Sequence, residues 1–302
     1  MYYNSLNNHL KERFGCKVYK LALQCGYTCP NRDGKIDTRG CIFCSQKGSG
    51  NFAEPFCESV YSQIEKAKLI LNKKIQNGKY IAYFQSFTNT YGEPCYLEKI
   101  FTEAINHPDV VALSIATRPD CLGNEILAIL KKLNTIKPVW VELGLQTAKP
   151  SSVEYIRRGF KNEVYVSAIK SLKAIGVEVI THVILGLPNE DKSDILKTVC
   201  FAANSGTDGI KLQLLHVLKN TDLQKDFENN AFSVLSLDEY IDILCDCIEV
   251  LPPHIVIHRL TGDGDKKELI APLWSADKKN VLNKINKALN ERNIVQGSKE
   301  QS

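Results

Sequence analysis

The sequence predicts an α/β fold, a parallel (β/α) partial or complete TIM-like barrel of about six or seven βα units. Two observations lead to this prediction: short apolar runs alternate with longer amphipathic segments, and polar clusters follow the apolar runs. A strand followed by a helix, repeated along the chain, implies parallel βα units joined by right-handed crossovers. That number of units is large for a small open sheet and slightly small for a closed barrel of about eight strands.

The strands are predicted from runs that are short, nearly continuous and rich in Val, Ile, Leu and Tyr, as buried strands are. They lie at residues 18–23, 80–85, 110–116, 139–145, 177–185, 209–215 and 255–260. The helical patterns between them lie at residues 58–74, 95–106, 124–133, 162–175, 192–204 and 237–250. Reactive residues in such folds lie on the loops after the strands. The polar clusters fall there, at residues 25–44, 85–91, 117–120, 146–147 and 186–190.

The length and composition suit a globular protein with one large core, since 302 residues are 44% hydrophobic and 24% charged. We expect one barrel domain over residues 1–275, including a cysteine loop at 25–50, and then a basic C-terminal helix or tail at 276–302. The basic residues of this tail are Lys278, Lys279, Lys284, Lys287, Arg292 and Lys299. They indicate either a polyanion partner or a solvated helix face.

The N-terminal segment lacks the apolar centre of a signal peptide, and the longest apolar run, at 177–188, is too short to span a bilayer. We therefore expect a cytoplasmic protein with no membrane partner. The chain has eleven cysteines, an odd number. In a reducing compartment, this number argues against a disulfide framework. They favour a mixture of buried thiols and metal ligands.

The stretch CGYTCPNRDGKIDTRGCIFC at 25–44 contains four of these cysteines. Cys41 and Cys44 can chelate one metal centre, because a two-residue gap lets both thiolates face inward from a tight turn. A structural zinc is the common occupant of a four-cysteine set, although the Cys25-x3-Cys29 spacing matches a zinc knuckle poorly. The alternative uses only Cys29, Cys41 and Cys44, and three thiolates on a four-iron cluster leave one iron open to a small molecule.

The spacing Cys29-x11-Cys41-x2-Cys44, with Phe43 before the last cysteine, resembles the cluster loop of radical S-adenosylmethionine (SAM) enzymes. More narrowly, the chain resembles the bacterial radical SAM proteins related to the catalytic subunit of Elongator. Over roughly residues 14–274, the chain contains short sequence motifs similar to those of this subgroup and in the same order: TCPNRDG, GCIFC, FQSFTNTY, TRPD, VELGLQT, ILGLP and HRLTGDG.

The resemblance implies that Cys29, Cys41 and Cys44 ligate a [4Fe-4S] cluster whose unique iron binds the amino and carboxylate groups of SAM. Cys25 falls outside that ligand set, and its role stays open. The gap between the first two cluster cysteines is longer here than in Elongator's subunit. Further SAM contacts are implied at Phe43, Gln85, Ser86, Arg118, Gln146, Ile184 and Gly186.

Several of these positions also have a simpler interpretation. Arg118 suits bidentate carboxylate binding, and the carboxylate could be that of SAM or of Asp120 in the same loop. Glu142 points into the predicted barrel and needs a partner there, and His182 is expected to be a hydrogen-bonded core residue. Residues on late loops that could contact substrate are His216, Lys219, His258, Arg259 and Asp263.

The resemblance implies a radical SAM enzyme whose cluster receives an electron from an external flavodoxin- or ferredoxin-type donor and cleaves SAM to a 5′-deoxyadenosyl radical. It also implies tRNA as partner, with processing of a carboxymethylaminomethyl group on a wobble uridine and a downstream methyltransferase as a further partner. Acetyl-CoA chemistry is not expected within this core. The alternatives are a radical SAM enzyme for a small molecule or peptide, and a non-enzymatic zinc-bearing nucleic-acid-binding protein.

Overall fold

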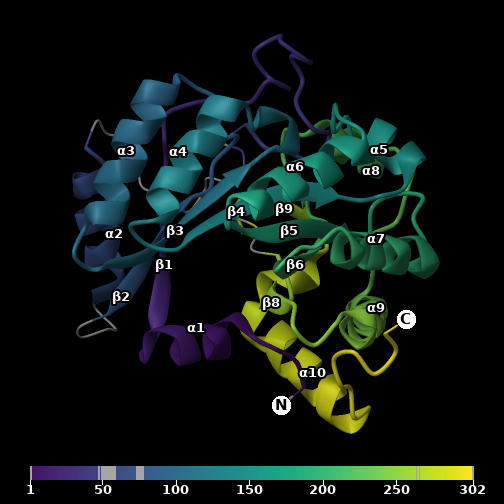
Figure 1. The fold of residues 1–302 in the computed structure, drawn as a ribbon. Coiled ribbons are helices and arrows are strands. Elements are labelled where there is room, and N and C mark those ends of the chain that lie inside the picture. The colour runs from purple at the N-terminus through teal and green to yellow at the C-terminus, as the bar shows by residue number, and fades with distance from the viewer. Residues whose placement is uncertain are drawn as a thin grey trace.

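The computed structural model describes residues 2–46, 48, 59–72, 78–262, 264 and 266–300. Parallel strands form one curled sheet, in the order β1-β2-β3-β4-β5-β6-β8 (Figure 1). The strands are β1 Val18–Leu23, β2 Lys79–Phe84, β3 Val110–Thr117, β4 Val139–Gln146, β5 Glu178–Leu185, β6 Gly209–Leu214 and β8 Val256–Arg259. Each strand is added beside the preceding one, as successive right-handed crossovers require. The sheet is a half-barrel, which confirms the prediction of a partial TIM-like barrel.

Helices pack on the outer face of this sheet (Figure 1). Those predicted from the sequence are α2 Val60–Asn72, α3 Pro94–Asn106, α4 Asn124–Asn134, α6 Asn162–Ala174, α7 Lys192–Asn204 and α9 Leu237–Val250. Their starts carry the expected signals: Asp191 and Asp194 form a capping box on α7, and Ser236 and Glu239 form one on α9. The main hydrophobic core lies between these helices and the sheet.

The remaining elements were not predicted individually. They are α1 Leu6–Phe14, α5 Pro150–Tyr155, α8 Asp222–Glu228, the antiparallel pair β7 Val217–Leu218 and β9 Leu269–Ala271, the 3-10 helices η1 Pro119–Cys121 and η2 Leu273–Ala276, and α10 Lys278–Glu291. Only α10 falls in a segment for which a helix was expected. It buries Val281, Ile285 and Leu289 in the main core. The division of the chain at residue 275 stays a prediction.

The inner face of the half-barrel has an apolar layer and a polar layer. Side chains two residues apart on a strand point to the same face. The apolar layer consists of Val18, Ile81, Ala112, Trp140 and Ile180, with Leu10 of α1 packed against them. The polar layer, two residues further along the strands, consists of Lys20, Tyr83, Ser114, Glu142, His182 and Lys211. Contacts between distant strands show the curl, since Lys20 of β1 binds Glu142 of β4.

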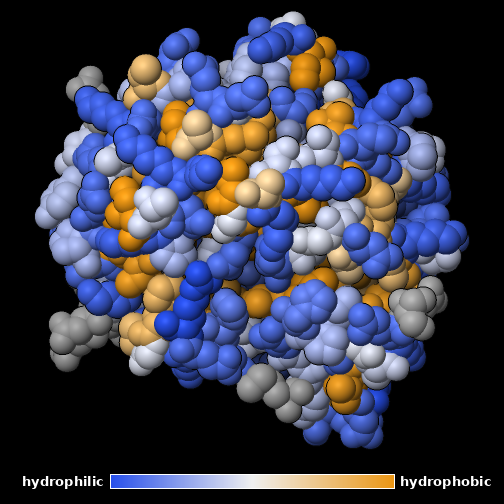
Figure 2. Space-filling model, in the orientation of Figure 1, coloured by the Kyte–Doolittle hydropathy of each residue, from blue (hydrophilic) through white to orange (hydrophobic). Residues whose placement is uncertain are grey.

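The chain termini pack at the open side of the half-barrel. Ser5 pairs with Ile257 of β8, and α1 then leads into β1, so the N-terminal segment bridges the two edge strands. Gln296 accepts a hydrogen bond from the Asn4 backbone and donates to the carbonyl oxygens of Pro252 and Ile255. The face shown in Figure 2 is mostly hydrophilic, with hydrophobic patches between the polar side chains. No helix within the described residues has the length and apolar character needed to cross a bilayer.

Candidate functional site

The loop between β1 and α2 carries the cysteine stretch and is folded by its own backbone hydrogen bonds. The amide of Gly40 donates to the carbonyl of Asn31 at 2.7 Å, and the amide of Arg32 donates to that of Cys29 at 2.8 Å. A second tight turn joins the amide of Cys44 to the carbonyl of Cys41 at 3.0 Å. The two turns fix the positions of the three cysteines relative to one another.

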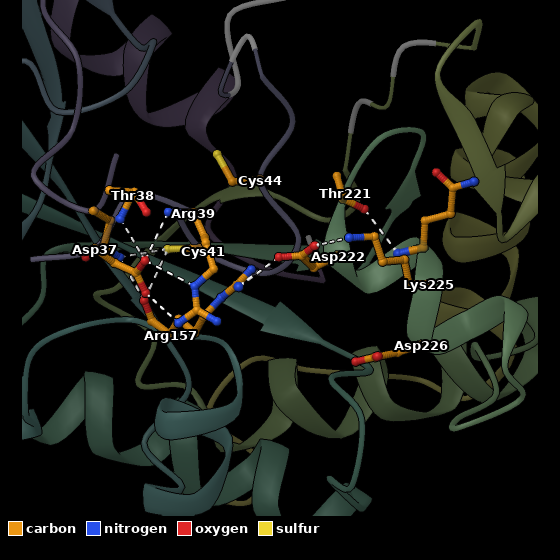
Figure 3. A network of polar contacts seen from close by, with 12 residues as sticks. Asp37, Thr38, Arg39, Cys41, Cys44, Arg157, Thr221, Asp222, Lys225 and Asp226 are labelled. Atoms are coloured by element: carbon orange, nitrogen blue, oxygen red, sulfur yellow. Dashed lines mark hydrogen bonds and ion pairs between the residues drawn. The ribbon is translucent and has the colours of Figure 1, made fainter. Parts of the chain in front are cut away.

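Two short helices hold this loop from outside. The amide of Ile42 donates to Ile156, which follows α5, and the carbonyl of Ile42 accepts from Leu223 of α8. Arg157 forms an ion pair with Asp222 of α8 at 2.8 Å, and Figure 3 shows this pair beside Cys41. The loop is therefore clamped between α5 and α8 at its centre.

The thiols of the loop are close enough to influence one another electrostatically. Burial, together with the neighbouring Cys44, raises the pKa of Cys41 to about 12. Burial also raises the pKa of Cys44, and a charge on Cys29 adds to the effect at both thiols. Without a cation, such sites disfavour thiolates; a bound metal centre reverses this preference. Three sulfur donors on one loop suit an iron–sulfur cluster with one iron left open.

Cys25 belongs to a different environment. Its side chain is 3% exposed, and its Sγ donates to Asn89 Oδ1 at 3.0 Å. Asn89 in turn donates to the carbonyls of Phe84 and Ala116 at the ends of β2 and β3. Cys25 is thus part of a buried hydrogen-bonded network that joins strand ends.

A cavity of about 500 Å³ lies below the cysteine loop, inside the mouth of the half-barrel. Of the predicted cofactor-binding residues, Phe43, Cys44, Gln85 and Ile184 line it. Phe43 also packs on a small hydrophobic cluster that contains Ile184. The structure therefore brings one of the cysteines predicted to bind a cluster, one aromatic residue and two strand ends to the same cavity.

The other predicted SAM contacts are Ser86, Arg118, Gln146 and Gly186. They lie at strand ends, and none of them is among the described residues that line this cavity. Ser86 is 3% exposed, and its hydroxyl has no hydrogen-bond partner among the described residues. Gln146 ends β4 with a φ of 61°, and its amide lies over Gly144, where a Cβ would be 2.6 Å from Nε2. Gly186 has a φ of 89° and faces Leu235, so that a Cβ there would be 2.9 Å from Cδ1.

Arg118 adopts the internal arrangement that the sequence left open. Its Nε and Nη2 atoms donate to the two carboxylate oxygens of Asp120 at 2.9 and 2.7 Å. The guanidinium also lies 5.1 Å from the ring centroid of Phe160. The carboxylate partner of Arg118 in this structure is therefore that of its own loop.

Glu142 has the partners that its burial requires. Its Oε1 accepts from Lys20 at 2.6 Å and from Ser114 at 2.8 Å. Its Oε2 accepts from Lys211 and lies 2.7 Å from Nε2 of His182. Although burial opposes it, the charges of the two lysines lower the pKa of Glu142 well below its usual value. The carboxylate is ionised. His182 is hydrogen-bonded, as expected, but it lines the cavity with a side chain 17% exposed and does not lie in the core.

Three further residues line the cavity and were not predicted from the sequence as site residues: Lys20, Tyr83 and Lys211. The available signal was a lysine in the middle of an apolar strand, in VYKLAL and in GIKLQL. Of the late-loop residues, His216, His258 and Arg259 line the cavity. Lys219 donates its amide to the carbonyl of Glu268, in the segment leading to β9. Asp263 lies outside the described residues.

A parallel half-barrel with three cysteines on the loop after its first strand is the arrangement of a class of iron–sulfur enzymes. The chain belongs to the radical SAM superfamily, whose model matches residues 28–202, and a radical SAM C-terminal domain model matches residues 207–291. Within that superfamily it is a radical SAM enzyme of the Elongator-related subgroup. Proteins of this family generally use a [4Fe-4S] cluster and SAM.

The chain is similar to the following three proteins. The chain is 43% identical over 295 residues to the uncharacterized protein YtqA of Bacillus subtilis, covering 98% of this chain and 92% of YtqA. It is 27% identical over 156 residues to the tRNA uridine(34) acetyltransferase of Methanocaldococcus jannaschii, covering 51% of this chain and 28% of that protein. The structure of Elp3 from Methanocaldococcus infernus matches the fold with a TM-score of 0.71 at 19% identity, over 92% of this chain and 64% of that one.

Proposed function

We propose that Cys29, Cys41 and Cys44 hold a [4Fe-4S] cluster and that SAM binds beside it in the 500 Å³ cavity. The observation that supports this proposal is that Cys25 lies in a different environment from the other three cysteines. Three lie on one clamped loop and influence one another, whereas Cys25 is hydrogen-bonded to Asn89. When bound, the cluster supplies the electron that cleaves SAM and releases a 5′-deoxyadenosyl radical.

The residues around the cavity would orient SAM and exclude water from it. Ile184 and Phe43 offer an apolar wall for the adenine ring. Gly186 would present its backbone to the base, although Leu235 fills the space where a Cβ would lie. Gln85 and the unpartnered hydroxyl of Ser86 offer hydrogen bonds at the end of β2. Gln146 would contact the ribose. Arg118 would act on the SAM carboxylate only by leaving Asp120, so we assign it a supporting role.

The substrate we propose is the side chain of a tRNA wobble uridine, with processing of its carboxymethylaminomethyl group in the cytoplasm. The named relative that supports it is the tRNA uridine(34) acetyltransferase, which matches about half of this chain. A flavodoxin- or ferredoxin-type protein would donate the electron, and a methyltransferase would act downstream on the product. The exposed lysines of α10, Lys279 and Lys284 among them, would contact the tRNA backbone.

The test is the iron, sulfide and zinc content of the protein purified without oxygen. The wild type should hold about four irons and four sulfides. The Cys29/Cys41/Cys44→Ala triple variant should lose them, and Cys25→Ala should retain them. About one zinc without sulfide, lost in Cys25→Ala, would refute the cluster assignment and favour a zinc-bearing binding protein.

The substrate is tested separately by SAM cleavage in the presence of tRNA. Cleavage should rise when tRNA carrying the carboxymethylaminomethyl group is added, and should not rise with tRNA that lacks a modified wobble uridine. Equal stimulation by a tRNA-free small-molecule or peptide fraction would favour the other radical SAM alternative.

A further inference from the structure

Asn31 of the cysteine loop places its side-chain amide against Cys41, one of the three cysteines proposed to hold the cluster. Its Nδ2 lies 3.5 Å from Sγ of Cys41, at hydrogen-bond distance for a sulfur acceptor. The same Nδ2 donates to the carbonyl oxygens of Arg157 at 2.7 Å and Arg158 at 3.4 Å. Figure 3 shows Cys41 on its loop beside Arg157. Only 1% of Asn31 is exposed, so bulk water does not compete for its amide.

The surroundings of Asn31 fix the direction in which its amide points. Its backbone carbonyl accepts from the amide of Gly40 at 2.7 Å, which holds the residue in the loop. A reversed amide would turn Oδ1 toward the carbonyl oxygens of Arg157 and Arg158, so that acceptors would face one another. On the other side, Gly159 lies so close that a Cβ there would be 2.8 Å from Oδ1. Nδ2 is therefore the atom that faces the thiol.

A purely structural role does not account for this arrangement. Oδ1 of Asn31 is buried and has no hydrogen-bond partner among the residues that the structure describes. A buried acceptor without a partner is costly. At the other end of the amide, three acceptors share two N–H groups. A side chain that only joined the loop to Arg157 would use one of these donors, so the second is available for Cys41.

A thiolate changes the balance among the three acceptors. The neutral thiol of Cys41 is a weak acceptor, whereas a thiolate that binds a metal centre is negatively charged. Hydrogen bonds to charged acceptors are roughly twice as strong as those between neutral groups. With a cluster bound, the second N–H of Asn31 would therefore favour the sulfur over the carbonyl of Arg158, which lies 3.4 Å away.

We propose that Asn31 donates a hydrogen bond to the Cys41 sulfur and thereby raises the reduction potential of the cluster. The inference rests on the proposed function, which assigns the cluster to Cys29, Cys41 and Cys44. Net charge and hydrogen bonds to the sulfurs set the potentials of such clusters. The reduced cluster carries one more negative charge, so a donor at the sulfur stabilises it more than the oxidised cluster. Asn31 thus eases electron transfer from the external donor.

The experiment measures the midpoint potential of the cluster by electron paramagnetic resonance, in a redox titration of the protein purified without oxygen and without added SAM. Asn31→Leu is similar in shape and removes both N–H donors. The equilibrium constant for one-electron reduction should fall about tenfold in this variant, a shift of about 59 mV to lower potential. The iron and sulfide contents should stay at about four each.

Asn162→Leu provides the matched control. Asn162 holds the same neighbouring segment, since its Oδ1 accepts from Arg158 and its Nδ2 donates to the carbonyl of Ala148. It lies at the start of α6, outside the cysteine loop. This variant should keep the midpoint potential of the wild type. An equal fall in both variants would mean that the potential follows the packing of this segment, and would overturn the inference.

A measurement on the wild type keeps the inference testable if Asn31→Leu fails to fold or to hold iron. Protein labelled with ¹⁵N in the side-chain amides of asparagine is studied by pulsed electron paramagnetic resonance with its cluster reduced. A hydrogen bond from Nδ2 of Asn31 should give a ¹⁵N coupling to the cluster spin through the sulfur of Cys41. A reduced cluster without such a coupling would refute the hydrogen bond.

The failure of the proposed function gives a different result. A wild type without iron and sulfide, or an iron and sulfide content that survives Cys41→Ala, would refute the assignment of the cluster itself. A complete cluster whose midpoint potential is the same in the wild type and in Asn31→Leu would refute only the role of Asn31.

Discussion

His182 holds a neutral imidazole inside the half-barrel. Its Nε2 lies 2.7 Å from Oε2 of Glu142, which favours the charged imidazolium. Burial and the charge of Lys211 act against it more strongly and lower the pKa of His182 to about 4. An unfolded histidine titrates near 6.5. The unfolded state therefore binds more protons than the folded state between these two values.

We expect the free energy of unfolding to fall as the pH falls from 6.5 toward 4, because protons bind preferentially to the unfolded state. The histidine contributes at most about 3 kcal/mol over this window. Urea unfolding at pH 7, 5.5 and 4.5 measures it. His182→Asn should flatten the profile, and His254→Asn, at an exposed position, should not. The same pH slope in wild type and His182→Asn would contradict this assignment.

At the same scale, the sequence predicted which residues belong to the site better than it predicted which residues they contact. The three cysteines proposed as cluster ligands follow from spacing and resemblance, and the need of Glu142 for a partner follows from its place in a buried strand. Its partners Lys20 and Lys211 lie 122 and 69 residues away in sequence. Only the curl of the sheet brings them together, and no local pattern encodes that curl. The closing of Arg118 on Asp120 was one of two arrangements that local geometry allowed.

At the scale of elements, long amphipathic segments were predicted within a few residues, whereas α5 and α8 were missed. Helices of six and seven residues are too short for a 3.6-residue period to appear. Their formation depends on tertiary contacts, such as the ion pair of Arg157 with Asp222. These two short helices clamp the cysteine loop, so the elements hardest to predict are those that shape the site.

The clamp gives a prediction about the protein without any cofactor. Asp222→Ala removes the ion pair with Arg157 and should speed amide hydrogen exchange over residues 39–44, by about threefold or more. The free energy of unfolding should change by less than about 1 kcal/mol, since the Asp222 side chain is 34% exposed. Mass spectrometry of exchange resolves the loop from the rest of the chain.

Glu228→Ala provides the matched control, because Glu228 lies on the same helix and accepts from Gln224 rather than contacting the loop. It should leave exchange over residues 39–44 as in the wild type. Equal acceleration in both variants would mean that α8 acts through its own stability and not through the ion pair.

At the scale of the whole molecule, the basic C-terminal segment divides into two groups. Arg292 forms an ion pair with Asp242, and Lys299 forms ion pairs with Asp246 and Glu249, all on α9. Lys279 and Lys284 are exposed on α10. Trp274, just before α10, donates to the carbonyl of Leu235, just before α9, so both helices begin near the cavity end of the sheet.

This division predicts the salt dependence of tRNA binding. The logarithm of the association constant should fall linearly with the logarithm of salt concentration, because bound lysines release counterions. Lys279→Gln/Lys284→Gln should reduce the magnitude of that slope by about two. Arg292→Gln should leave it unchanged, since Arg292 is paired with α9. A salt-independent affinity, or an equal effect of Arg292→Gln, would exclude α10 as the contacting element.

Among the described residues the sheet is also open along one side, where β1 and β8 are its edge strands and the N-terminal segment bridges them. The cavity is lined from both edges, by Lys20 and Ala22 on one and His258 and Arg259 on the other. A closed ring can receive a chain only if a free end threads through it. A half-barrel that is open on one side does not require threading. An internal residue of a polymer can therefore enter and leave the cavity while the polymer stays intact.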